Sequence, residues 1–139
     1  MHLILREGND VIGKPLRGFC ADARQAGQLL RHAREVGLIT VLRVFILDSM
    51  ALDNIDKLRT ACNPDLIELV PGLMPKIIRQ VHSLHRTPLI AGGLIRDKED
   101  TMSALSAGAI SISTSCEEAW QELDSAQTPA QRQFRKEGM

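Results

Sequence analysis

The stretch PLIAGGLIRDKEDTMSALSAGAISISTS, residues 88–115, reads as a strand, a loop, a helix and a second strand. The first strand is predicted over residues 89–91. Asp97 then begins a helix with an acidic first turn, which helix N-termini favour. Gly108 suits the left-handed end of that helix, and residues 109–113 alternate apolar and hydroxyl side chains, as strands do. Strand, helix and strand at this spacing predict a parallel βαβ unit.

The carboxyl ends of these two strands have a composition that suits an oxyanion. Gly92 and Gly93 permit positive φ and close approach of backbone amides to a ligand, while Ser113 and Thr114 offer hydroxyl donors nearby. In (β/α)₈ barrels a phosphate commonly binds between the loops after the last two strands, against a short helix, which residues 116–123 could supply. The alternative is that the glycines form only a tight turn and the hydroxyls cap the final helix.

The preceding units repeat the pattern of a buried strand followed by an amphipathic helix. Asp48 is expected to cap one helix, Pro75 fits the first turn of the next, and Gly72 lies in the loop between strand and helix. The expected strands cover residues 39–47 and 65–70, and the expected helices cover residues 50–61 and 75–85.

Two charges stand alone inside these apolar strands, Arg43 in the first and Glu68 in the second. A buried charge is costly unless it is paired or held by a ligand. Either the two side chains pair with each other and order the barrel, or they line a ligand site, since polar groups near barrel strand ends usually do so.

Composition excludes several classes of protein. The 139 residues suit one domain, and 17 basic against 17 acidic residues leave no global attraction to nucleic acid or membrane. Three widely spaced cysteines, Cys20, Cys62 and Cys116, indicate reduced thiols rather than disulfides or a metal knot. A charged start and the lack of a long apolar run predict a cytoplasmic location, and no His or Cys spacing predicts a metal.

The N-terminal part is less regular. Strands are expected at residues 2–6 and 16–21, with a loop over 7–15, followed by a basic helix over 24–36. The arginines of that helix are expected to form a solvated face, with a contact to an RNA backbone as the alternative. They are Arg24, Arg31 and Arg34.

Three segments together, VLRVFILDSMAL, ELVPGLMPKIIRQV and IAGGLIRDKEDTMSALSAGAISISTS, resemble the glycerol uptake operon antiterminator family of bacterial regulators. The resemblance runs without a large gap from about Leu29 to Trp120. It implies a TIM-barrel-like fold, glycerol 3-phosphate as effector, and action on leader RNA to prevent termination of transcription of glycerol-uptake genes. We expect no catalytic residue and no cofactor. The phosphate site then falls on Gly72, Gly92, Gly93, Ser113 and Thr114, with Arg43 and Glu68 lining the ligand.

A full barrel takes about 250 residues, so this chain has room for four to five average βα units. We therefore expect an α/β fold with an incomplete parallel barrel of five to six strands over residues 1–127, and a disordered tail over 128–139. Family members carry more chain before this point. The exposed edges would pair with a second copy, or the chain is a truncated descendant.

Two other functions remain open from the sequence. A phosphate-binding barrel enzyme acting on a small sugar or triose phosphate could use Glu68 as its base, although no lysine or histidine lies at a predicted strand end. A truncated remnant that binds nothing is the third reading. RNA binding has no localised signal, because aromatic residues make up only 3% of the chain and stacking platforms are missing.

Overall fold

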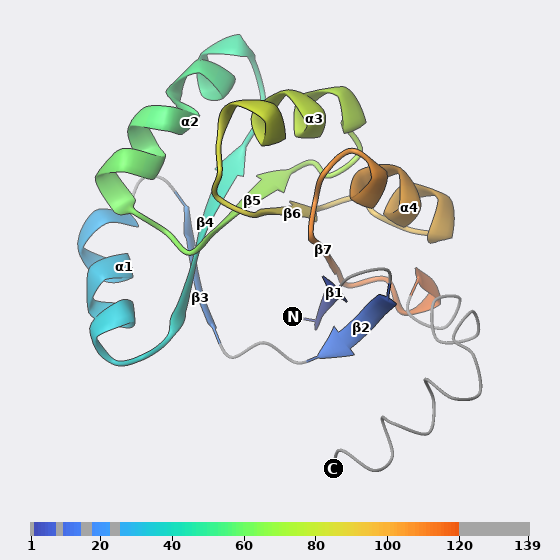
Figure 1. The fold of residues 1–139 in the computed structure, drawn as a ribbon, viewed down its shortest axis with the longest axis horizontal. Coiled ribbons are helices and arrows are strands. Elements are labelled where there is room, and N and C mark those ends of the chain that lie inside the picture. Colours follow the sequence, from blue (N-terminus) through green and yellow to red (C-terminus); the bar gives the residue numbers. More distant parts are fainter. Residues whose placement is uncertain (1, 8–9, 15–17, 23–25, 120–139) are drawn as a thin grey trace.

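The computed structural model describes the backbone of residues 2–7, 10–14, 18–22 and 26–119, and side chains from residue 27 onward. Within these ranges the chain forms seven strands and four helices in a mixed order (Figure 1). The expected tail over 128–139 and half of the expected helix over 116–123, residues 120–123, lie outside the described residues. The elements are β1 His2–Glu7, β2 Asp10–Lys14, β3 Gly18–Asp22, α1 Ala26–Glu35, β4 Ile39–Phe45, α2 Ser49–Cys62, β5 Leu66–Val70, α3 Pro75–Leu84, β6 Leu89–Gly92, α4 Lys98–Ser106 and β7 Ser111–Thr114.

All seven strands join one sheet in the order β2-β1-β7-β6-β5-β4-β3. Its core is the parallel set β4 to β7, extended by β3 on one side, so the α/β class is confirmed. The other side is antiparallel, because β1 pairs with both β7 and β2. The described edges, β2 and β3, are not paired with each other.

The expected number of strands, five to six, is wrong because β2 was not predicted. Residues 10–14, which form this strand, were expected to be a loop. Asp10 and Gly13 are poor strand residues on their own. In the fold they pair with β1 from Glu7 opposite Asp10 to Leu3 opposite Lys14, and this ladder outweighs local propensity.

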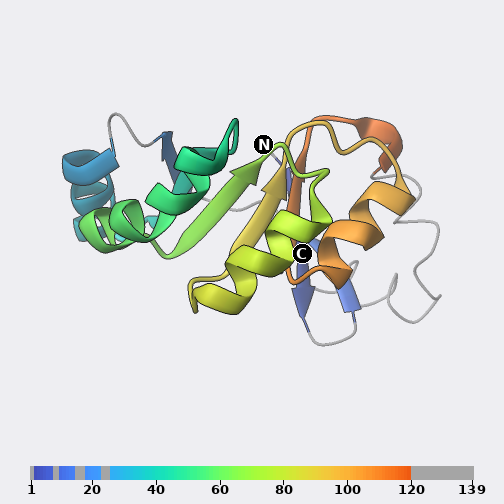
Figure 2. The same ribbon diagram turned by 90° about the horizontal axis from the view of Figure 1, so that it is seen from above.

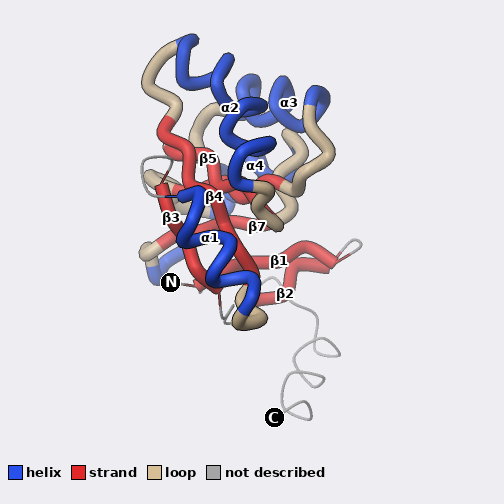
Figure 3. The backbone as a smooth tube through the Cα atoms, turned by 90° about the vertical axis from the view of Figure 1, so that its left-hand side faces the viewer, coloured by secondary structure: helices blue, strands red, loops and turns tan. Residues whose placement is uncertain are grey.

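The helices pack on one face of the sheet, which we call the helix-covered face. Buried side chains from every helix, such as Leu30, Ile55 and Ile78, join those of Leu42 and Ile67 from the strands in one core. Figures 1 and 2 show α2, α3 and α4 side by side over the parallel strands. In Figures 1 and 3 the β1–β2 end of the sheet lies on the side of the parallel strands that faces away from α2, α3 and α4, so the sheet curls away from these helices.

The other face, here called the inner face, carries a smaller apolar cluster. Val41, Leu66 and Ile90 are at most 9% exposed, and Ile110 packs against them. Ile110 was expected to share a face with Ile112, but Ile112 belongs to the helix-covered core. The chain bends at Ile110 before β7 begins at Ser111, so the strand alternation starts one residue later than expected.

Local signals for helix ends agree with the structure. The Asp48 carboxylate accepts a hydrogen bond from the Ala51 amide at 2.8 Å, and the Asp97 carboxylate accepts one from the Asp100 amide at the same distance. Gly108 has φ +116°, as expected after α4. These caps fix where the loops that border the candidate site begin and end.

Candidate functional site

An ion pair lies in the middle of the inner face. Arg43 and Glu68 are directly paired across β4 and β5, and Arg43 Nε lies 2.8 Å from a Glu68 carboxylate oxygen. The Glu68 side chain is 2% exposed and that of Arg43 is 35% exposed, so the carboxylate is buried while the guanidinium reaches toward solvent. The first of the two readings of these charges, mutual pairing, is therefore present in the fold.

The Glu68 side chain also extends over the next strand. A Cβ built on Gly92 would overlap Glu68 Oε1, which means that the carboxylate occupies the space a side chain at position 92 would take. Gly72 is also closely packed, because its Cβ would lie 2.9 Å from the Gly92 amide nitrogen. Glycine at both positions lets the ends of β5 and β6 approach each other.

The loop after β6 has an unusual backbone. Gly93 has φ +75° and Leu94 has φ 64°, so two successive residues are left-handed, and Leu94 is 61% exposed. The Gly72 amide donates a hydrogen bond to the Gly93 carbonyl at 3.1 Å, which ties this loop to the one after β5. Left-handed leucine costs roughly 1–2 kcal/mol, and such costs gather at binding sites.

The two predicted hydroxyl donors lie differently. Ser113 is paired with Gly92 and lies on the inner face, 7% exposed. Thr114 is the next residue and therefore faces the helix-covered side, where its hydroxyl donates to the Ile95 carbonyl at 2.7 Å and accepts from the Cys116 amide. The hydroxyl hydrogen of Thr114 is thus committed to the loop after β6.

Three residues near these were not among the predicted site residues. The Cys116 thiol donates to the Arg96 carbonyl at 3.3 Å, which adds a second link between the β6–α4 loop and the segment after β7. Arg96 is exposed in the loop that carries Gly93. Ser111 is fully buried on the inner face, and its hydroxyl has no hydrogen-bond partner. The alternation of β7 placed Ser111 beside Ser113, but only the structure shows that it is unpartnered.

Of the seven predicted site residues, four share the inner face around one point: Arg43, Glu68, Gly92 and Ser113. Gly72 and Gly93 join them from the two loops just above. Thr114 adjoins the same loop from the other face of the sheet.

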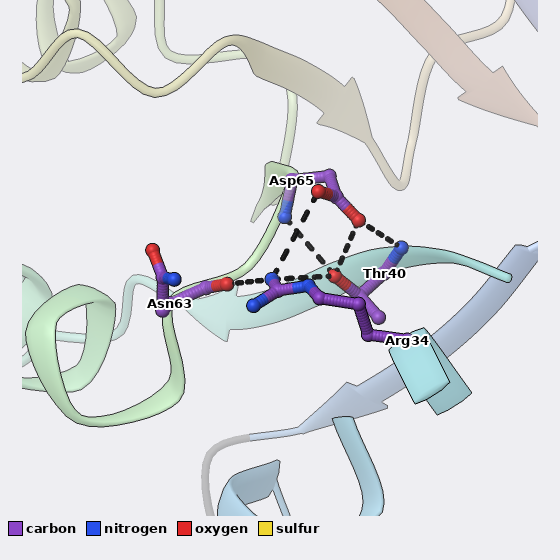
Figure 4. Close-up of polar contacts among 4 residues, drawn as sticks. All are labelled: Arg34, Thr40, Asn63 and Asp65. Atoms are coloured by element: carbon purple, nitrogen blue, oxygen red, sulfur yellow. Dashed lines mark hydrogen bonds and ion pairs between the residues drawn. The ribbon is translucent and has the colours of Figure 1, made fainter. Parts of the chain in front are cut away.

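A second polar cluster lies at the opposite, amino end of the parallel strands (Figure 4). The Asp65 carboxylate accepts hydrogen bonds from the Thr40 amide at 2.8 Å and hydroxyl at 2.7 Å, and the Asp65 amide donates back to that hydroxyl. Arg34 of α1 donates to the Asn63 carbonyl and lies 3.9 Å from Asp65. Arg34 was expected on a solvated face, and this is wrong, because it joins α1 to the ends of α2 and β5.

The bonds from Thr40 also set the acidity of this cluster. They hold the pKa of the Asp65 carboxyl below its usual value, with a smaller contribution from Arg34 and against an opposing effect of burial. Thr40, Asp65 and Arg34 pair with one another and with the Asn63 carbonyl, so the arrangement is that of a structural tie.

Other kinds of site find no support in the part of the chain that the structure describes. It contains no group of three or more His, Cys, Asp or Glu residues arranged to hold a metal ion. None of its helices is long and apolar enough to cross a membrane. Cys62 and Cys116 are free thiols, and burial raises the pKa of Cys62.

Comparison with known proteins adds an independent finding. A family model described as glycerol-3-phosphate responsive antiterminator matches residues 24–120. The Escherichia coli K12 protein YgcP, named as uncharacterized, is 45% identical over 92 residues, which are 66% of this chain and 48% of that protein. The chain therefore spans about half the length of this relative.

Two crystal structures resemble the fold. One, a glycerol uptake operon antiterminator regulatory protein from Listeria monocytogenes, has a TM-score of 0.68 at 30% identity and is matched over 76% of this chain and 55% of its own. A second, an antiterminator-related protein from Thermotoga maritima, has a TM-score of 0.59 at 27% identity, covering 76% and 58%. The chain belongs to the glycerol-3-phosphate responsive antiterminator family.

Proposed function

We propose that the chain is a regulator, not an enzyme, that binds glycerol 3-phosphate and acts on leader RNA to prevent termination of transcription of glycerol-uptake genes. The observation that carries this proposal is the family match over residues 24–120, which contains every predicted site residue. We place the protein in the cytoplasm and treat the curled parallel sheet as part of a TIM-barrel-like architecture. A second copy of the chain is a candidate to pair with its edges.

The candidate site suits a small ligand with a phosphate at one end and hydroxyls at the other. Of the five residues predicted for the phosphate end, Gly93 and Ser113 remain our candidates for direct contact with the phosphate. Gly72 and Thr114 shape the site instead, because the Gly72 amide and the Thr114 hydroxyl already donate hydrogen bonds within the protein. Gly92 is covered by the Glu68 carboxylate. The Glu68 carboxylate over Gly92 repels an anion, so we place the phosphate outward of Gly92, toward Gly93.

The charged pair then serves the other end of the ligand. Glu68 can accept hydrogen bonds from ligand hydroxyls, and the partly exposed Arg43 can reach the ligand from β4. Arg96, exposed in the β6–α4 loop, is our candidate for a cation near the phosphate. A role for Glu68 as a catalytic base is less favoured, because one of its oxygens already accepts from Arg43 Nε.

Ligand binding is tested by thermal unfolding of the purified chain with glycerol 3-phosphate, with glycerol and inorganic phosphate as controls. A ligand at about 100 times its dissociation constant adds roughly 2.7 kcal/mol, which raises the midpoint by several degrees. We expect a rise with glycerol 3-phosphate that neither control reproduces. A cooperative transition that glycerol 3-phosphate does not move would contradict the effector assignment.

RNA action is tested separately with a reporter placed behind the leader and terminator of a glycerol-uptake gene. We expect transcription past the terminator to rise only when the chain and glycerol 3-phosphate are both present. Ligand binding without any effect on termination would leave a sensor that does not act on RNA, and the regulatory half of the proposal would be wrong.

A further inference from the structure

Ser111 carries the one buried side-chain nitrogen or oxygen without a hydrogen-bond partner in the described part of the chain. The residue is 0% exposed, so solvent at the surface does not satisfy its hydroxyl. Leaving a buried hydroxyl unpaired costs about 1–3 kcal/mol, and such groups in a native fold call for an explanation.

The position of Ser111 points to the ligand site. Across the sheet Ser111 is paired with Ile90, and Ile90 is paired with Glu68, so the three residues form one row on the inner face. Arg43 continues this row beyond Glu68. Ser111 and Glu68 are thus the two polar groups on either side of the Ile90 side chain, two strand spacings or about 10 Å apart at the backbone.

The next row toward the carboxyl end carries no large side chain of its own at its centre. Gly92 follows Ile90 on the inner face and has no side chain, and Ser113, its partner in β7, is small. The Glu68 carboxylate reaches over Gly92 and fills the place that a side chain there would take. A ligand that enters from the loops above therefore meets a carboxylate on the β5 side and hydroxyls on the β7 side.

We propose that Ser111 determines specificity by hydrogen-bonding one hydroxyl of a polyol phosphate while Glu68 accepts from a neighbouring hydroxyl. This inference rests on the proposed function and adds to it the recognition of the diol end. A phosphate is the wrong partner for this row because Glu68 repels it, whereas a hydroxyl can donate to the carboxylate and also pair with a serine.

The test compares two ligands on two variants by isothermal titration calorimetry. Glycerol 3-phosphate carries both hydroxyls, and propyl phosphate has the same chain and phosphate without them. We expect Ser111→Ala to weaken glycerol 3-phosphate binding about tenfold and to leave propyl phosphate binding unchanged. Ser106→Ala, at an exposed position in α4, is the matched control and should change neither affinity.

Thermal unfolding without ligand completes the test. Because Ser111→Ala removes an unpartnered buried hydroxyl, we expect its ligand-free midpoint to equal or exceed that of the wild type. A lower midpoint with unchanged affinity would show that Ser111 holds an internal water only, and would overturn the inference.

The remaining outcomes separate this inference from the proposed function. If the wild type binds glycerol 3-phosphate and Ser111→Ala binds it equally well, the inference alone fails. Equal losses for both ligands would mean that Ser111 supports packing or the phosphate end, and would also overturn it. If the wild type binds no glycerol 3-phosphate, the proposed function and the inference fail together.

Discussion

Polar groups lie next to buried strands in two parts of the parallel sheet, and the two parts differ in how these groups are hydrogen-bonded. At the amino end, Thr40 and Asp65 exchange hydrogen bonds and Arg34 closes the cluster onto Asn63. Three residues further along the strands, in the middle of the inner face, Glu68 is buried with Arg43 as its ion-pair partner. In the same row the Ser111 hydroxyl has no hydrogen-bond partner. Mutual pairing of polar groups marks a cluster that holds elements together, while a buried hydroxyl without a partner, on the same sheet face as a buried carboxylate, marks a candidate binding site.

Backbone conformation separates the two ends in the same way. At the amino end, the left-handed residue Asn63 ends α2, a position where such a residue is ordinary, and its amide donates to the Arg59 carbonyl. At the carboxyl end, Gly93 and Leu94 are left-handed in a loop that follows a strand. These two residues do not terminate a helix, so helix capping does not explain their left-handed conformation. A role in shaping a binding site is therefore favoured.

The largest expected effect comes from breaking the ion pair in the middle of the inner face. Arg43→Met leaves the Glu68 carboxylate, 1% exposed as a residue, without this guanidinium, and should cost about 3 kcal/mol of unfolding free energy. Glu68→Gln should cost about 1 kcal/mol, because Arg43 is partly exposed and can turn to water. Urea unfolding of both variants measures the difference.

The double variant Arg43→Met with Glu68→Gln is the control for that comparison. It should recover part of the loss, because no charge then remains in the row. Equal losses of unfolding free energy in the two single variants would show that the burial of Glu68 does not determine the cost of breaking the ion pair. The result also bears on ligand tests, since weaker binding by Arg43→Met must be separated from its lower stability.

A middle-sized effect concerns the loop after β6. Gly93→Ala should cost about 2 kcal/mol, because the new Cβ combines left-handed strain with a contact 2.9 Å from Val70 Cγ1. Gly37→Ala is the matched control: it has φ +80° and open space around it, so only the strain of about 1 kcal/mol applies. Chemical unfolding of both variants isolates the cost of the contact. Equal costs would mean that the loop can shift away from Val70.

The smallest effect concerns the amino-end cluster and its response to acid. The pKa of Asp65 is lower in the folded chain than in the unfolded chain, mainly because of Thr40. Its stabilising contribution is therefore complete above the unfolded pKa of about 3.9 and is lost as the pH falls through the folded value. Thermal midpoints from about pH 6 to about pH 2 should fall less for Asp65→Asn than for the wild type.

A residual acid response in Asp65→Asn is expected from Asp56, whose pKa is lowered by its hydrogen bond from Arg59. Thr40→Val should cost about 1–2 kcal/mol at neutral pH and also reduce the acid response. Parallel curves for wild type and Asp65→Asn would contradict the assignment. Ligand binding at the other end should be unchanged in both variants.

The predictability of the molecule from its sequence also differs between regions. Helix ends depend on a few adjacent residues, so the caps at Asp48 and Asp97 and the bend at Gly108 were predictable. The strand β2 was missed because its stability comes from pairing with β1, and pairing between segments leaves little trace in local composition. The antiparallel direction of β1 against β7 was missed for the same reason.

The candidate site was predictable in its members but not in its bonding. Strand alternation put Arg43 and Glu68 in neighbouring apolar runs, and the structure joins them. Periodicity could not show that the Thr114 hydroxyl donates a hydrogen bond to the Ile95 carbonyl, or that the Ser111 hydroxyl has no hydrogen-bond partner. Such facts depend on distances between strands, which no spacing along the chain contains.

The contact between Glu68 and Gly92 constrains how this sequence can change. Since the carboxylate occupies the place of a side chain at position 92, Gly92→Ala forces the buried Glu68 side chain to move away from its present position. The same alanine becomes acceptable once residue 68 is shortened. The two positions are therefore epistatic, and the order of substitutions decides which sequences can be reached through folded intermediates.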